Sequence, residues 1–133
     1  MKKVWINGSF DVLHIGHIRL LEYGADLGEV RVGLDTDERI KEKKGINRPY
    51  NSINDRIEFI SSIKFVNSVV TFKNDDELIQ RIIEYQPDYM VIGNDYKYET
   101  IIGVEHIPNV MFFDKIKDKS TSSILRYDSN NNR

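Results

Sequence analysis

The sequence contains no cysteine among its 133 residues, which excludes disulfide bonds and thiolate metal sites. A long hydrophobic run is also missing, because no apolar stretch approaches the roughly 20 residues that a membrane-spanning helix requires. The first residues, MKKVWINGSF, carry lysines but lack the long apolar core of a secretory signal. We therefore expect a cytoplasmic protein that does not associate with membranes.

An excess of charge of one sign is absent as well. The formal net charge is -2, so the chain has no general positive field that would attract nucleic acid, and we expect no nucleic-acid partner. The hydrophobic fraction of 40% and the length suit one domain with one core, and there is no internal repeat. We assign residues 1–127 to that domain and expect the polar tail 128–133 to be disordered.

Five short runs rich in Val, Ile and Phe are typical of strands. They are continuous rather than alternating, which indicates strands buried on both faces of a parallel sheet. The runs cover residues 3–7, 30–35, 68–72, 89–93 and 109–114. Helical patterns separate them, and strands that alternate with helices favour an α/β fold. The sequence predicts a single doubly wound, Rossmann-like sheet of five parallel strands with helices on both faces.

The helical patterns have recognisable apolar faces and ends. Ser52, followed by Asp55, predicts a capped helix start. Pro87 should end the helix that begins with the acidic residues near 75, and Ser120 to Ser123 are natural caps for a last helix. The expected apolar faces are Ile18, Leu20, Leu21 and Ala25; then Ile53, Ile57, Ile60 and Ile63; then Leu78, Ile82 and Ile83.

The segment NGSFDVLHIGHIRLLEYG, residues 7–24, follows the first expected strand and holds two of the three histidines. In doubly wound sheets, ligands bind beyond the carboxyl ends of the strands. A helix that begins near Ile15 would direct free amides and its positive end at an anion, and one helical turn would bring His14 and His17 to one side. Gly8 and Gly16 would let the backbone approach a ligand closely. The pattern predicts a phosphate site.

Two other interpretations of the histidine pair stay open on the residues alone. The pair could bind a metal, although no third ligand is evident. The imidazoles could also be ordinary polar groups with partners at a helix start.

The stretch GSFDVLHIGHIRLLEYGADLG resembles the signature of the HxGH nucleotidylyltransferases, the cytidylyltransferase-like family. This resemblance implies that His14 and His17 contact the triphosphate of a nucleotide. It also implies that the preceding segment lines the nucleotide site, with Asp11 as a further candidate for the acceptor or a phosphate. The implied nucleotide-binding residues here are Asn7, Gly8, Ser9, Phe10 and Gly16.

The segment DERIKEKKGINRPYNSINDR, residues 37–56, is either a solvated charged loop or a flexible basic loop over the triphosphate. The resemblance favours the second interpretation, since members of the family carry a lysine here and an arginine on the following helix. Lys44 is the best match for the catalytic lysine, with Lys41 and Lys43 as competitors. Arg56 is the corresponding arginine, expected to anchor a phosphate.

Two later segments extend the resemblance. VIGNDYKYETIIGVE resembles the corresponding segment of heptose-type adenylyltransferases and implicates Gly93, Asp95 and Lys97, although an Asp in such a turn is often only turn chemistry. Glycerol-3-phosphate cytidylyltransferases have a Trp-containing segment there. Near the end, Lys115 stands where those enzymes have an arginine, and lysine does not replace arginine at a bidentate phosphate site. The Ser-Thr motif of the family corresponds to Ser120, Thr121 and Ser122.

The resemblance implies transfer of a nucleoside monophosphate from a nucleoside triphosphate to a phosphorylated sugar or polyol, with release of pyrophosphate. The heptose-1-phosphate type is the leading interpretation. The alternatives are a CTP-dependent enzyme of the glycerol-3-phosphate type and a nucleotide-binding module without catalysis. We expect Mg²⁺ to arrive bound to substrate, no metal site made by the protein, and a homodimer.

Overall fold

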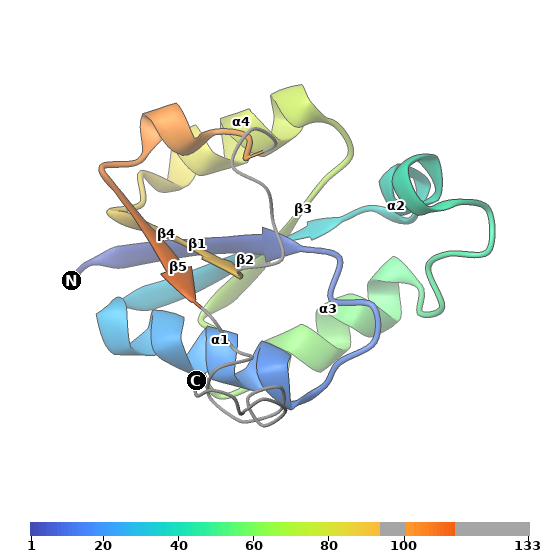
Figure 1. Cartoon of the computed structure of the whole chain (residues 1–133), viewed down its shortest axis with the longest axis horizontal. Coiled ribbons are helices and arrows are strands. Elements are labelled where there is room, and N and C mark those ends of the chain that lie inside the picture. Colours follow the sequence, from blue (N-terminus) through green and yellow to red (C-terminus); the bar gives the residue numbers. More distant parts are fainter. Residues whose placement is uncertain (94–100, 114–133) are drawn as a thin grey trace, which may run out of the picture.

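The computed structural model describes residues 1–93 and 101–113. Its centre is a single sheet in the order β3-β2-β1-β4-β5, in which every neighbouring pair is parallel. Figure 1 shows the strands crossing the middle of the molecule. The strands are β1 (Lys3–Gly8), β2 (Glu29–Asp35), β3 (Ser68–Phe72), β4 (Tyr89–Gly93) and β5 (Asn109–Phe113). The expected fold class is confirmed.

The strand order reverses beside β1. The chain runs outward from β1 through β2 to β3, then crosses to the other side of β1 and continues through β4 to β5. Strands β1 and β4 pair only near their starts, at Val4 with Tyr89 and Trp5 with Met90. Their carboxyl ends therefore flank the switch point, where doubly wound sheets bind ligands.

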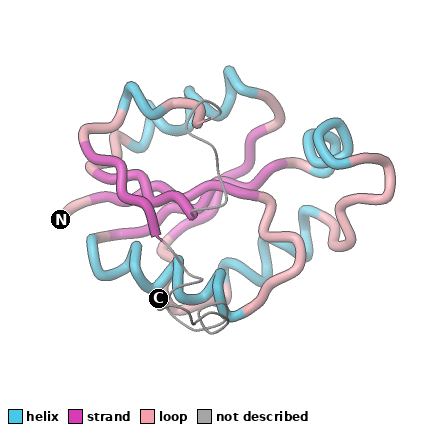
Figure 2. Tube along the Cα trace, in the orientation of Figure 1, coloured by secondary structure: helices cyan, strands magenta, loops and turns pink. Residues whose placement is uncertain are grey.

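Helices cover both faces of the sheet (Figures 1 and 2). Helices α1 (Ile15–Leu27) and α3 (Ile53–Ser61) lie on one face, and α4 (Asp75–Tyr85) with the short 3₁₀ helix η2 (Val104–His106) lies on the other. Each long helix has a side-chain cap at its start: His14, Ser52 and Asn74 accept hydrogen bonds from amides of the first turn. These caps explain where the helices begin.

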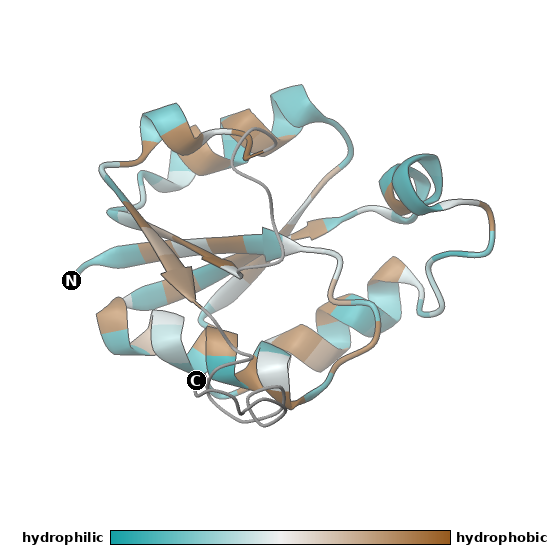
Figure 3. Ribbon diagram, viewed as in Figure 1, coloured by the Kyte–Doolittle hydropathy of each residue, from teal (hydrophilic) through white to brown (hydrophobic). Residues whose placement is uncertain are grey.

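Two apolar clusters hold the layers together. On the α1 and α3 face, Val4 and Ile6 of β1 pack with Leu21 and Ile60. On the α4 face, Trp5 of β1 packs in a second cluster with Phe72, Leu78 and Ile82. Because alternate residues of β1 are buried on opposite faces, its centre from Val4 to Ile6 is continuously apolar. Figure 3 shows hydrophobic residues concentrated on the strands and on parts of the covering helices.

Two expectations need correction. The segment expected as a flexible loop contains helix α2 (Asp37–Lys44), which extends beyond the end of β2 (Figure 1). Thr36 caps this helix, acids occupy its first turn and lysines its last, so its charges match the helix dipole. On α4, Ile83 is half exposed rather than on the buried side with Leu78 and Ile82, because the buried stripe repeats at Leu78, Ile82 and Tyr85.

Several expectations lie outside the described residues: the roles of Asp95, Lys97, Lys115, Ser120, Thr121 and Ser122, the last helix, and the tail 128–133. Within the described residues, every helix is too short or too polar to span a membrane.

Candidate active site

A cavity of about 370 Å³ opens at the switch point. Residues at the carboxyl ends of β1 and β4 form its floor, among them Asn7, Gly8 and Gly93. The cavity is also lined by Ser9 and Phe10 of the loop after β1, His17 of α1, and Lys43 and Lys44 of α2. The structure thus gathers segments that are distant in the sequence at the edge where a ligand is expected.

The two histidines form a reciprocal cap at the start of α1. His14 Nδ1 accepts from the Gly16 amide at 3.1 Å, and His17 Nδ1 accepts from the His14 amide at 3.1 Å. The ring centroids are 4.1 Å apart, which confirms that the two imidazoles lie on one side. An Nδ1 atom that accepts carries no hydrogen, so the neutral rings carry theirs on Nε2. The cap therefore fixes both tautomers as Nε2 donors.

This cap changes which groups can donate hydrogen bonds to an anion at the start of α1. The Gly16 amide is used by His14 Nδ1, and the His17 amide donates to the His14 carbonyl at 3.0 Å. The expected free amides of the first turn are therefore partly occupied within the protein. The helix dipole still favours an anion here, and Nε2 is the donor nitrogen that the cap assigns to each neutral imidazole.

The bend before the helix depends on Phe10. Phe10 has a left-handed backbone, with φ of 47°, whereas Gly8 ends β1 and Gly16 lies within α1. Such a conformation costs about 1–3 kcal/mol for a residue with a side chain. Phe10 is buried, and its ring packs 5.3 Å from the ring of His17. Packing of the aromatic ring, not glycine freedom, holds this bend.

The lysines of α2 differ in position. Lys44 Nζ lies 3.4 Å from Ser9 Oγ, and Lys43 and Lys44 both line the cavity. Lys41 is exposed and is not part of the lining. The structure therefore places Lys44 and Lys43 at the cavity, and Lys41 away from its lining.

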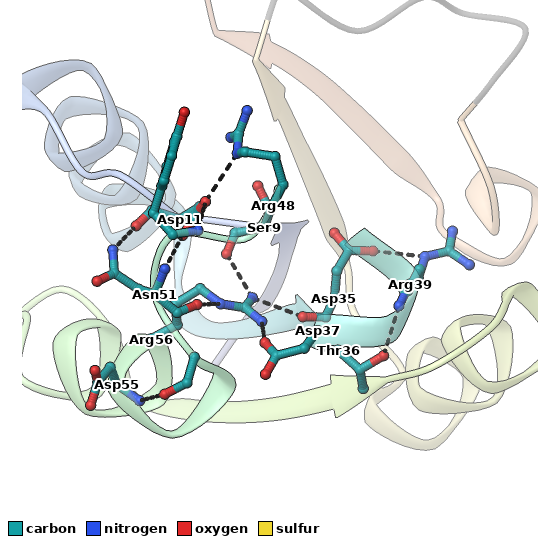
Figure 4. Close-up of polar contacts among 12 residues, drawn as sticks. Ser9, Asp11, Asp35, Thr36, Asp37, Arg39, Arg48, Asn51, Asp55 and Arg56 are labelled. Carbon is teal, nitrogen blue, oxygen red and sulfur yellow. Dashed lines mark hydrogen bonds and ion pairs between the residues drawn. The ribbon is translucent and has the colours of Figure 1, made fainter. Parts of the chain in front are cut away.

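Arg56 lies outside the cavity lining and is fully buried. Its Nη1 donates to the carbonyls of Ser9 at 3.0 Å and Asp35 at 2.8 Å, and its Nη2 bonds Asp37 Oδ1 at 2.6 Å. Its Nε donates to the Asn51 carbonyl at 3.0 Å. Figure 4 shows the guanidinium at the centre of these contacts. The residue expected to anchor phosphate instead joins the loops after β1 and β2.

Asp11 has a similar joining role. Its carboxylate accepts from the amides of Tyr50 and Asn51, both at 2.8 Å, and from Arg48 Nε at 3.3 Å (Figure 4). Burial raises the pKa of Asp11, but these hydrogen bonds and the Arg48 charge outweigh burial and lower the pKa below its ordinary value of 3.8. The ionised carboxylate fastens the histidine loop to residues 48–51, away from the cavity lining.

Among the polar residues that line the cavity, sequence reasoning missed two, Asp35 and Arg39. Asp35 is the last residue of β2, Arg39 lies in α2, and the two form an ion pair of 2.7 Å. Asn7 is oriented by Trp5 Nε1, which donates to its Oδ1 at 2.8 Å. The spacing of Asp35 and Arg39, four residues across a helix start, was the available signal. This spacing was overlooked because residues 37–56 were interpreted as a charged loop.

The match with known families covers nearly the whole chain. A family model described as cytidylyltransferase-like matches residues 5–126. The protein named "Bifunctional protein HldE" of Campylobacter fetus subsp. fetus is 39% identical over 123 residues, 92% of this chain and 27% of the relative. The protein of the same name from Helicobacter hepaticus is 40% identical over 127 residues, 93% of this chain and 26% of the relative. The chain thus spans about a quarter of the length of these relatives.

Solved structures show the same fold. A lipopolysaccharide core biosynthesis protein from Thermoplasma volcanium aligns with a TM-score of 0.73 and 26% identity, over 86% of this chain and 97% of that one. A protein of unknown function from Archaeoglobus fulgidus aligns with a TM-score of 0.68 and 19% identity, over 91% and 95% of the two chains. With the family match across residues 5–126, the chain belongs to the cytidylyltransferase-like family of nucleotidyltransferases.

Proposed function

We propose that this protein transfers AMP from ATP to a sugar 1-phosphate of the heptose type and releases pyrophosphate. The observation that carries the proposal is the cavity at the switch point, where His17, Lys44 and Ser9 converge from three segments. The other support comes from the relatives and from the segment after β4, which resembles heptose-type adenylyltransferases.

The reaction requires two anions to meet. A phosphate oxygen of the acceptor attacks the α-phosphorus of ATP, the bond to the bridging oxygen breaks, and pyrophosphate leaves with the electron pair. An ionised phosphate is already a nucleophile, so no general base is needed. The protein must therefore hold the reactants in line and stabilise the charge on the phosphoryl oxygens.

The cavity residues suit this task. His17 supplies an Nε2 donor whose tautomer is fixed by the cap, and Lys44 supplies a positive charge beside Ser9. His14 is exposed and lies outside the cavity lining, but its ring contacts that of His17. We assign to it contact with an outer phosphate of the triphosphate. Arg56 and Asp11 act indirectly, because they hold the loops that carry Ser9 and the histidines.

Magnesium fits this site as part of the substrate. Among the described residues, no group of three His, Asp or Glu side chains could hold a metal ion. A Mg²⁺ ion with triphosphate oxygens and water as ligands needs no such group, and it would offset charge on the leaving pyrophosphate.

A carbohydrate acceptor is supported by one structural relative. The Thermoplasma volcanium protein with the same fold is titled a lipopolysaccharide core biosynthesis protein, and such cores are built from sugars. The homodimer, which members of the family commonly form, stays a prediction for this chain.

The test is a matrix of ATP or CTP against sugar 1-phosphates, including heptose 1-phosphate, and polyol phosphates, scored by pyrophosphate release. We expect release with ATP and heptose 1-phosphate above every other pair. Release that is fastest with CTP and glycerol 3-phosphate would replace the proposal by the cytidylyltransferase alternative. Nucleotide binding without release for any pair would support a non-catalytic module.

A further inference from the structure

The pair Asp35 and Arg39 is held rigidly at the cavity. Arg39 is 7% exposed, and its Nε donates to Asp35 Oδ1 at 2.7 Å. Its Nη2 pairs with Asp75 Oδ1 at 2.9 Å, and its guanidinium lies over the Phe72 ring at 5.1 Å. Three contacts on different sides fix the plane of the guanidinium.

One donor and one acceptor of this pair are left over. Within the described residues, Arg39 Nη1 and Asp35 Oδ2 make no hydrogen bond or ion pair. Both side chains line the cavity. Figure 4 shows one oxygen of Asp35 directed at Arg39 and the other directed away from it. A buried guanidinium with an unused N–H group is costly unless a ligand completes its hydrogen bonding.

The charge around Arg39 argues against phosphate as that ligand. One guanidinium and two carboxylates, Asp35 and Asp75, give this group a formal charge of −1. The nearby lining from α4, β4 and residue 101 is apolar: Leu78, Ile92 and Ile101. A neutral group that both donates and accepts suits this corner better than an anion.

We propose that Asp35 and Arg39 recognise a vicinal diol of a substrate. One hydroxyl donates to Asp35 Oδ2, and its neighbour accepts from Arg39 Nη1. The inference rests on the proposed function, in which two substrates carry such a diol: the ribose of the nucleotide and the acceptor sugar. The pair is a specificity determinant, distinct from the phosphate-directed residues His17 and Lys44.

The experiment measures equilibrium binding by calorimetry, so it does not depend on turnover. One arm compares ATP with 2′-deoxy-ATP, 3′-deoxy-ATP and CTP. The other compares sugar 1-phosphates with counterparts that lack the hydroxyl at position 2, 3, 4 or 6 in turn, so that each vicinal diol is removed in at least one of them. The proteins are wild type, Asp35→Asn, Arg39→Lys, and the matched control Glu42→Gln, which changes an exposed side chain of the same helix. Circular dichroism melting establishes that each variant is folded.

We expect wild type and Glu42→Gln to bind the diol compound about tenfold more tightly than the deoxy compound in one arm. Asp35→Asn and Arg39→Lys should reduce that ratio to near one, and the arm in which this occurs identifies the ribose or the sugar. Arg39→Lys keeps the positive charge but loses the forked donor. It therefore tests the geometry even where a larger change unfolds the protein.

Three results would overturn the proposal. Deoxy ratios near one for wild type in both arms would show that no diol is recognised. Ratios that stay high in both variants would assign the diol to other residues. A change in the preference for ATP over CTP, with the deoxy ratios unchanged, would assign the pair to the base. The proposed function is tested separately: no pyrophosphate release in the substrate matrix would contradict it.

Discussion

At the scale of single residues, each histidine of the pair uses its ring for two roles under the proposed function: Nδ1 caps α1, and Nε2 donates to the substrate. The Nδ1 atoms cap α1 from within, and this leaves Nε2 as the donor nitrogen. Under the proposed function, the ring that binds substrate is therefore also positioned by its own cap bond. Replacing such a residue by alanine would mix the loss of the cap with the loss of the donor, so the substitution must keep one and remove the other.

His17→Asn makes this separation, because an asparagine oxygen can accept from the His14 amide while the side chain is too short to replace Nε2. We expect turnover to fall by about 10²-fold, as for other lost transition-state donors, with little change in melting temperature. His106→Ala is the control, since that histidine lies in η2 and its side chain pairs with Glu105 among the residues that the structure describes. Steady-state kinetics that match wild type for His17→Asn would remove His17 from the chemistry.

Arg56 is an interior residue, so we expect its substitution to change the free energy of unfolding. Arg56→Met leaves three carbonyls and the Asp37 carboxylate without their buried partner, so we expect a loss of about 3–5 kcal/mol in the free energy of unfolding. Urea denaturation measures this loss. A variant that unfolds like wild type but no longer turns over would instead show that Arg56 contacts substrate.

At the scale of elements, α2 carries the cavity lysines on a helix whose start is tied to the sheet. Thr36 caps it, Arg39 pairs with Asp35 at the end of β2, and Asp37 pairs with Arg56. Because helical geometry fixes the direction of each side chain, the three lysines of α2 are not equivalent.

We therefore expect a graded response to removing the three lysines. Lys44→Ala should reduce kcat/KM by about 10²-fold and Lys43→Ala by less, while Lys41→Ala should resemble wild type. The measurement is kcat/KM for ATP under otherwise identical conditions. Equal losses at Lys41 and Lys44 would mean that α2 supplies only a diffuse positive field.

The loop that carries the histidines is fastened by Asp11, and this predicts a pH dependence. A pKa lowered below 3.8 contributes stability that is present above that value and is lost as pH falls through the folded-state pKa. Asp11→Asn should therefore lower the free energy of unfolding at pH 7 by about 2 kcal/mol. The difference from wild type should shrink steadily below pH 3.8.

Urea unfolding at a series of pH values measures this difference, and Asp26→Asn, an exposed carboxylate on α1, is the control. A difference between Asp11→Asn and wild type that persists undiminished at the acid end would rule out ionised Asp11 as its source.

At the scale of the whole molecule, the sequence predicted most of the architecture, because both faces of the sheet are buried and the strands are therefore recognisable as continuous apolar runs. Strand bounds differ from expectation by one residue at most, as at Gly8 and Glu29. Helix α2 was missed because its apolar content is a single buried Ile40, too little to produce a periodic pattern. Charge and capping stabilise this helix instead.

The closeness of the His14 and His17 rings was predictable, because the local helix start determines it. Contacts across the fold were not. Arg56 bonds Ser9, which is 47 residues away, so its burial depends on how the loops after β1 and β2 meet. The left-handed bend at Phe10 depends on packing against His17, and no residue type in the sequence indicates such a bend. Arg39 required knowledge that β2, α2 and α4 converge on one corner.

The central claim is that the cavity between the ends of β1 and β4 holds the triphosphate. A crystal structure with ATP in which a methylene group replaces the α,β-bridging oxygen tests it most directly. We predict phosphate oxygens within hydrogen-bond distance of His17 Nε2, Lys44 Nζ and Ser9 Oγ. A triphosphate bound away from all three groups would contradict the account.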